Sequence, residues 1–233
     1  MNLFYQPLLL EGILYLDADE SRHVVKVLRK KKGDPIKITD GEGSFYEAII
    51  THPDSHQCTF TINKKIPEAS KNFSIHIAIS PTKNADRIEW FVEKSVEFGI
   101  DEITLIECDH TERQHLKIDR LEKMAVSAMK QSLKAKLPVV HPLVNFRNVI
   151  LSSNTSEKYI AHVDAKNPNH LKNLVRPASS YLVLIGPEGD FSEEELLLAD
   201  ARGFKKISLG SARLRTETAG LAACHILNLA NTL

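Results

Sequence analysis

Two apolar runs, each ending in a glycine, lie close together near the C-terminus of this chain. The first, residues 181–185, is followed by a loop at 186–189, and the second ends at Leu209-Gly210. Short continuous apolar runs are typical of strands that are buried on both faces of a sheet. Two neighbouring backbone loops of this kind can form one pocket whose walls are main-chain N–H and C=O groups. The pair of loops therefore indicates a ligand site.

The first glycine loop predicts its own local structure. Residues 186–189 read Gly-Pro-Glu-Gly, which suits a type I turn because proline presets φ and glycine closes the turn. Ser192 and Glu195 have the spacing of a capping box, and Phe191 and Leu196 have that of a hydrophobic staple. A helix is therefore expected to begin at Ser192. Taken alone, this pattern is equally typical of an ordinary β–α connection.

The second glycine loop carries two opposite charges. Arg215 and Glu217 lie where a strand has just ended and a helix begins, with Thr216 as the expected N-cap. A largely apolar helix is predicted from Glu217 to the C-terminus. Taken singly, Glu217 is explained as a complement to the helix dipole and Arg215 as a solvated charge. Their position beside another glycine loop favours a ligand site instead.

The rest of the chain shows two patterns. Up to about residue 69, short strands at 36–38, 45–50 and 59–62 alternate with tight turns, which predicts a small β-barrel. Beyond a boundary at 67–72, strands at 75–79, 103–106, 159–163, 181–185 and 206–209 alternate with helices. That alternation predicts an α/β fold with a mostly parallel sheet. We expect one domain over residues 1–70 and a second over residues 71–233.

The two glycine loops and the sequence that follows the second resemble those of the SPOUT (trefoil-knot) RNA methyltransferases. Within that group, the chain is similar to the family that methylates N3 of a uridine in 16S ribosomal RNA. Segments 23–29 and 94–100 add weaker matches, so the resemblance spans nearly the whole chain. It implies a PUA-like, RNA-binding β-barrel over residues 1–70 and a SPOUT methyltransferase domain over residues 71–233. The C-terminal trefoil knot of that domain follows from the resemblance alone, since general topology rules argue against knots.

The resemblance also implies the chemistry: a homodimer that uses S-adenosylmethionine and methylates 16S rRNA of the small ribosomal subunit. The sulfonium supplies an electrophilic methyl, so no metal is needed. Arg215 is expected to stabilise the negative charge that develops on uracil when N3 loses its proton, and Glu217 to act as the base or to orient Arg215. The expected cofactor-binding residues are Leu184, Ile185, Gly186, Pro187, Glu188, Gly189, Leu209, Gly210, Leu214 and Thr216.

Two positions depart from the family pattern. The family usually has a second glycine after Gly189, where this chain has Asp190, which adds a side chain beside the ligand loop. It also usually carries an arginine where this chain has Ala212, and Arg213 follows one place later. Neither change removes the segment from Arg215 to Glu217.

A run of basic residues is the expected RNA-binding segment. The chain has 30 Lys and Arg against 30 Asp and Glu, so contact with nucleic acid must depend on local patches. A solvated face is the usual explanation of such a run. Here the surrounding domain is otherwise acidic, and the run from Arg22 to Lys37 has seven basic residues against one acid, Asp34, so we interpret it as a phosphate contact. Beside Lys37, its members are the expected RNA-binding residues Arg22, Lys26, Arg29, Lys30, Lys31 and Lys32.

Other classes of protein find little support. The chain has no Walker loop, GxGxxG fingerprint, GxSxG elbow or HExxH motif, and His52, His56 and Cys58 lack a fourth metal ligand nearby. With no membrane-length apolar run and no secretory signal, we expect a cytoplasmic protein. Two alternatives stay open: a SPOUT enzyme that methylates another RNA position, and an inactive RNA-binding factor of ribosome assembly.

Overall fold

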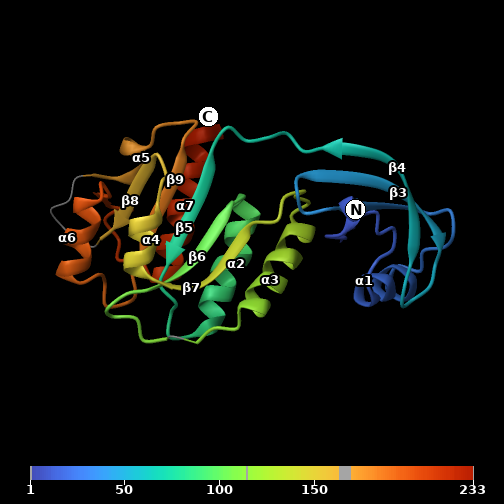
Figure 1. Cartoon of the computed structure of the whole chain (residues 1–233), viewed down its shortest axis with the longest axis horizontal. Helices are drawn as coiled ribbons and strands as arrows, with labels where there is room; N and C mark the ends of the chain where they lie inside the picture. The colour runs from blue at the N-terminus through green and yellow to red at the C-terminus, as the bar shows by residue number, and fades with distance from the viewer. Residues whose placement is uncertain (1, 114, 163–168, 233) are drawn as a thin grey trace. The chain divides into compact units, whose positions relative to one another are not determined.

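The chain folds into two compact units. The computed structural model describes residues 2–113, 115–162 and 169–232. The first unit comprises residues 1–70 together with 126–137, and the second comprises residues 71–125 and 138–233 (Figure 1). Residues 126–137 therefore pack with the N-terminal segment, although they lie far beyond the boundary that the sequence suggests.

The first unit is built on a four-stranded sheet. Its strands are arranged in chain order; the first two are parallel and the other pairs antiparallel. They are β1 (Leu3–Tyr5), β2 (Pro35–Thr39), β3 (Ser44–His52) and β4 (Thr59–Pro67). Between β1 and β2 the chain forms the 3₁₀ helix η1 (Leu9–Glu11), the helix α1 (Ala18–Arg22) and the π-helical turn η2 (His23–Val27).

One face of this sheet packs on a hydrophobic cluster. Alternate residues of β3 are buried, as expected for a strand with one face in the core. The cluster also includes Phe4, Leu16, Ile38 and Phe60. Residues 126–137 attach to the same unit through polar contacts. The Thr39 hydroxyl donates to the carbonyl of Ala135 at 2.8 Å, and Lys130 forms an ion pair with the buried Glu20.

The second unit contains a six-stranded parallel sheet, which confirms the predicted α/β class. The order is β10-β8-β9-β5-β6-β7, and every neighbouring pair is parallel. Strand β9 lies inside this sheet, and its residues 181–185 are almost fully buried, as their apolar run predicts. The strands are β5 (Ser74–Ile79), β6 (Glu102–Glu107), β7 (Val139–Asn145), β8 (Glu157–Ala161), β9 (Ser180–Ile185) and β10 (Lys205–Ile207).

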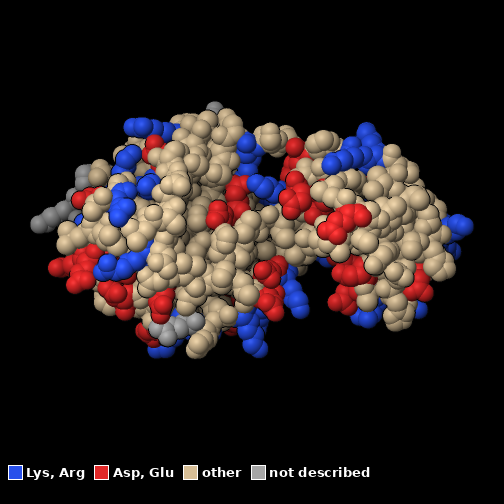
Figure 2. Space-filling model, in the orientation of Figure 1, with Lys and Arg blue, Asp and Glu red and all other residues tan. Residues whose placement is uncertain are grey.

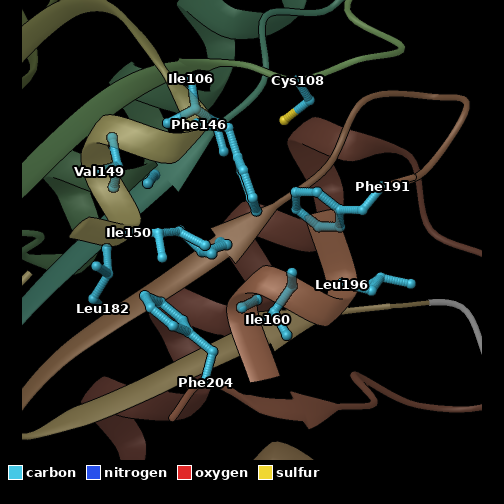
Figure 3. Packing of buried hydrophobic residues seen from close by; sticks show 13 residues of the cluster. Ile106, Cys108, Phe146, Val149, Ile150, Ile160, Leu182, Phe191, Leu196 and Phe204 are labelled. Atoms are coloured by element: carbon cyan, nitrogen blue, oxygen red, sulfur yellow. The ribbon is translucent and has the colours of Figure 1, made fainter. Parts of the chain in front are cut away.

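Helices cover both faces of this sheet. On one face, α2 (Ala85–Phe98) and α7 (Thr216–Thr232) pack so closely that a Cβ on Gly220 would lie 2.7 Å from the ring of Phe91. On the other face, α4 (Phe146–Ser152) and α6 (Glu193–Ala201) enclose a cluster in which Phe146 and Phe191 are 5.5 Å apart between ring centroids (Figure 3). The remaining helices are α3 (Ile118–Gln131) and α5 (Leu171–Leu174). Among the described residues, no helix is long and apolar enough to cross a membrane.

Several predicted elements end at different residues. Strand β8 ends at Ala161, and Val163 lies outside the described residues. The predicted strand at 206–209 is too long, because β10 ends at Ile207. The sequence pattern also missed β7, in which Pro142 interrupts the apolar run. Because β7 is an edge strand, a residue without an N–H group is tolerated there.

Candidate functional site

A cavity of about 1260 Å³ opens at one edge of the parallel sheet. Strands β8, β9 and β10 end there in register, since Ala161 pairs with Ile185 and with Ile207. We call this edge the carboxyl edge. Ligands of open α/β sheets bind at such an edge, because the loops that follow the strands are free to surround them. The lining comprises Ala161, His162, His170, residues 185–190, residues 207–216 and Ala219.

The first glycine loop turns one residue later than predicted. The N–H of Asp190 donates to the carbonyl of Pro187 at 3.0 Å, so the turn spans residues 187–190 rather than 186–189. Both glycines of this loop lie close to neighbouring side chains. A Cβ on Gly186 would lie 3.0 Å from the ring of Phe191, and one on Gly189 would lie 3.1 Å from Cβ of His110. Backbone atoms consequently form this wall of the cavity.

The predicted capping box fixes the end of this loop. The Ser192 hydroxyl accepts a hydrogen bond from the Glu195 N–H, and the Glu195 carboxylate accepts one from the Ser192 N–H at 2.9 Å. The other carboxylate oxygen of Glu195 accepts from the N–H of Asp109 at 3.0 Å. Because Asp109 follows β6, the capping box also ties the β6 loop to the first glycine loop.

The side chain of Thr216 joins the two glycine loops. The Thr216 hydroxyl donates to the carbonyl of Gly186 at 3.1 Å. The prediction of Thr216 as an N-cap was wrong, because α7 begins at Thr216 itself and its hydroxyl is engaged with the other loop. Gly210 has a φ of 130°, which L-residues rarely adopt, so the second loop also needs its glycine.

The cavity collects most of the predicted site residues. Every predicted cofactor-binding residue lines it except Leu184, which is fully buried in the cluster beneath α4 and α6. Arg215 is exposed and lines the cavity, as do Ala212 and Arg213 of the altered segment. Asp190, which stands where the family usually has a glycine, also lines the cavity.

Glu217 lies elsewhere. It is only 6% exposed and does not line the cavity. One carboxylate oxygen lies 3.9 Å from Nε of Arg87 in α2, and the other has no hydrogen-bond partner among the described residues. The expectation that Glu217 lies beside Arg215 at the mouth of the loop therefore needs correction: the carboxylate is buried within the packing of α2 and α7.

The sequence pattern missed the contribution of β8. Its loop brings His162 and His170 to the cavity, and Nδ1 of His162 lies 2.9 Å from Oδ2 of Asp190. No glycine follows β8, so the motif that marks the other two loops is absent. Only the strand order, which places β8 beside β9, reveals this wall.

The predicted RNA-binding residues lie in the first unit, on α1, on η2 and in the turn that follows. Arg22 pairs with Asp19 of its own helix at 3.2 Å, and Nζ of Lys30 donates to the carbonyl of Pro35 at 2.8 Å. Lys26, Arg29, Lys31 and Lys32 are exposed. On the face drawn in Figure 2, basic and acidic side chains are interspersed, as the balanced composition suggests.

Comparisons with known proteins agree on one family. An RNA methyltransferase domain model matches residues 69–228, and an RNA methyltransferase PUA domain model matches residues 16–63. The chain is 31% identical over 217 residues to ribosomal RNA small subunit methyltransferase E 2 of Borreliella burgdorferi, which covers 89% of this chain and 87% of that protein.

Solved structures show the same likeness. A probable rRNA-methyltransferase of Porphyromonas gingivalis has a TM-score of 0.93 and 42% identity, covering 99% of this chain and 98% of that one. A ribosomal RNA small subunit methyltransferase E of Neisseria gonorrhoeae, crystallised with S-adenosyl methionine, has a TM-score of 0.85 and 26% identity with the same coverage.

Proposed function

This chain belongs to the RNA methyltransferase family, and on that premise we propose that it transfers a methyl group from S-adenosylmethionine to N3 of a uridine in 16S rRNA of the small ribosomal subunit. The observation that carries the proposal is the cavity at the carboxyl edge, walled by two glycine loops that Thr216 joins. The relatives named as small subunit methyltransferases support the substrate.

The cavity fits the cofactor. Its volume is ample for a ligand of that size, and its walls combine main-chain polar groups with the apolar side chains of Ile185, Ile207 and Leu214. A Cβ at Gly186 or Gly189 would come close to Phe191 or His110, so a larger residue at either position would require a neighbour to move. Residues 185–189, Leu209, Gly210, Leu214 and Thr216 would hold the cofactor, which supplies an electrophilic methyl when bound.

Arg215 is the residue to which we assign charge stabilisation. Uracil N3 is a poor nucleophile until it loses its proton, here to solvent water, and that loss places negative charge on N3 and on the flanking carbonyl oxygens. A guanidinium beside those oxygens stabilises the anion and thereby favours deprotonation. Arg215 is an exposed cation of the cavity wall, so its side chain is accessible to a base that enters there. Because N3 lies on the pairing edge, the uridine must be unpaired or flipped out.

We assign Glu217 a positioning role. A carboxylate that is buried and outside the cavity lining cannot take a proton from a substrate in the cavity without a rearrangement. Its contact with Arg87 instead joins the first turn of α7, which follows Arg215 in the chain, to α2. Glu217 therefore fixes the start of the helix that presents Arg215.

The remaining features of the proposal follow from the resemblance. The first unit, over residues 1–70, would bind RNA through the basic segment at 22–32, and residues 71–233 would form the SPOUT domain with its C-terminal knot. The enzyme would act in the cytoplasm as a homodimer. The match of a PUA domain model to residues 16–63 supports an RNA-binding role for the first unit.

The experiment that tests the proposal uses purified protein, methyl-labelled S-adenosylmethionine and small ribosomal subunits that lack their native methylations. The RNA is then digested and the labelled nucleoside identified by mass spectrometry. A single 3-methyluridine in 16S rRNA is the expected result. Label on another nucleotide would overturn the substrate, and a failure to bind S-adenosylmethionine in calorimetry would favour the inactive RNA-binding factor.

A further inference from the structure

Asp190 is held in an unusual conformation at the wall of the cavity. Its φ is 63°, in the left-handed region where glycine fits without strain, although aspartate is among the residues that tolerate it. Its backbone N–H closes the turn at residues 187–190. Since glycine would make the same turn more easily, turn geometry does not explain the carboxylate.

The carboxylate has two neighbours in the described structure. Oδ1 accepts a hydrogen bond from the Phe191 N–H at 2.8 Å, and Oδ2 lies 2.9 Å from Nδ1 of His162, within ion-pair distance but without hydrogen-bond geometry. The backbone carbonyl of Asp190 lies 3.0 Å from Nδ1 of His110, which follows β6. Asp190 therefore connects the loops that follow three strands of the sheet, β6, β8 and β9. Its side chain is 28% exposed and that of His162 is 22% exposed, and both residues line the cavity.

We infer that Asp190, positioned by His162, is a specificity-determining residue that favours the cationic cofactor over the spent product. This inference rests on the proposed function. Methyl transfer breaks the bond between sulfur and the methyl carbon and leaves the electron pair on sulfur, while a carbon–nitrogen bond forms at the deprotonated uracil N3. The sulfonium becomes a neutral thioether, so the ligand loses one positive charge. A carboxylate in the cavity wall stabilises the ligand that carries the charge more than the one that does not.

The other charges of the wall leave the contribution of Asp190 to this preference intact. Arg213 and Arg215 are cationic, and Oε1 of Glu188 accepts a hydrogen bond from the Lys83 N–H at 3.4 Å. Electrostatic potentials add, so the contribution of Asp190 to the difference between the two ligands persists whatever its neighbours contribute. This contribution should reduce product inhibition, because it stabilises bound S-adenosylmethionine more than bound S-adenosylhomocysteine.

Calorimetric titration with S-adenosylmethionine and with S-adenosylhomocysteine tests the inference without measuring turnover. Asp190→Asn removes the charge and keeps a residue that tolerates the left-handed region. We expect it to lower the preference for S-adenosylmethionine by about three- to tenfold, the effect of one partly screened charge within a cavity. Asp190→Gly, which fits the turn without strain, should shift the preference in the same direction. Glu194→Gln, a matched loss of charge at an 83% exposed side chain outside the lining, should leave it unchanged.

The positioning role of His162 is tested in the same titrations. His162→Asn should lower the preference less than Asp190→Asn does, and the double variant should match Asp190→Asn alone, because His162 acts through the carboxylate. An unchanged ratio of affinities in Asp190→Asn and Asp190→Gly would overturn the inference. Wild-type protein that binds neither ligand would instead refute the proposed function on which it rests.

Discussion

The two ends of the parallel sheet both carry histidine–carboxylate pairs, and the pair at the carboxyl edge lines the cavity. At the carboxyl edge, His162 and Asp190 lie on loops that follow β8 and β9. At the amino end of β5–β7, Nε2 of His141 lies 2.7 Å from Oε1 of Glu102, and Nε2 of His76 lies 2.8 Å from the Thr104 hydroxyl. We call these four residues the amino-end cluster.

The difference lies in the backbone that carries each pair. Residues of the amino-end cluster lie on the strands themselves, where His76 pairs in register with Glu102 and Thr104 with His141. Their side chains satisfy one another across the sheet, and no set of three or more such ligands in the described chain is arranged to hold a metal ion. Loops after a strand are free to open around a ligand, whereas strand positions are fixed by the ladder. Similar side chains therefore line a proposed ligand site at one end and contact one another across the strands at the other.

Replacement of Arg215 by alanine tests the carboxyl edge. Of the changes predicted here, its effect on the rate of methyl transfer should be the largest. Loss of the guanidinium that stabilises the uracil anion should reduce methyl transfer by about a hundredfold or more. Binding of S-adenosylmethionine should change by only about two- to threefold, because we assign the cofactor contacts to the two glycine loops and to Thr216 rather than to Arg215. Single-turnover methylation and calorimetry measure the two quantities. Unchanged turnover would remove Arg215 from the mechanism.

The amino-end cluster should instead make stability depend on pH. Burial lowers the pKa of His76 to about 4, with Glu102 opposing the shift and His141 adding to it. In the unfolded chain His76 binds a proton below its ordinary pKa of 6.5, whereas in the folded chain it does so only near 4. The contribution is thus complete above pH 6.5 and is lost as the pH falls toward 4. We expect the free energy of unfolding to drop by about 2 kcal/mol between pH 7 and pH 4.5.

Urea unfolding across this pH range checks the expectation. His76→Asn should remove most of the pH dependence and leave methyl transfer at pH 7 unchanged. His141→Asn is the comparison variant: it removes a 40% exposed side chain and the smallest of the three causes of the His76 shift, so most of the pH dependence should remain. If the pH dependence of unfolding survives in His76→Asn, groups other than His76 cause it. If His76→Asn loses methyl transfer at pH 7, the amino-end cluster also contributes to activity and the contrast between the two ends fails.

A third variant, Gly189→Ala, tests the backbone of the first glycine loop at the carboxyl edge. Its Cβ would lie 3.1 Å from Cβ of His110, so the loop must shift to admit it. We expect cofactor affinity to fall by about tenfold, equivalent to roughly 1.4 kcal/mol, with little change in unfolding. Isothermal titration measures the loss. Adding His110→Gly, which removes the opposing Cβ, should restore part of the affinity, and unaltered binding in Gly189→Ala would show that the loop yields freely.

The sequence predicted correctly those features that depend on residues close together in the chain. The capping box of Ser192 and Glu195 depends on three residues of spacing, and the apolar run of β9 reflects burial on both faces. Two partners that are distant in sequence could not be predicted this way. His162 meets Asp190 only because β8 lies beside β9, and Glu217 is buried because α7 packs against α2. The domain boundary and the assigned roles of the site residues stay predictions.

Residues 126–137 constrain how such a protein can be recombined. Helix α3 begins among residues of the second unit and ends among those of the first, where Ala135 accepts the hydrogen bond of Thr39 and Lys130 pairs with Glu20. A chimera made by exchanging residues 1–70 with those of a relative would replace Thr39 and Glu20 but keep the native partners of both. Transplanting the N-terminal unit intact therefore requires three crossovers in the gene, at 70/71, 125/126 and 137/138, so the unit that we propose to bind RNA is harder to exchange than a linear boundary suggests.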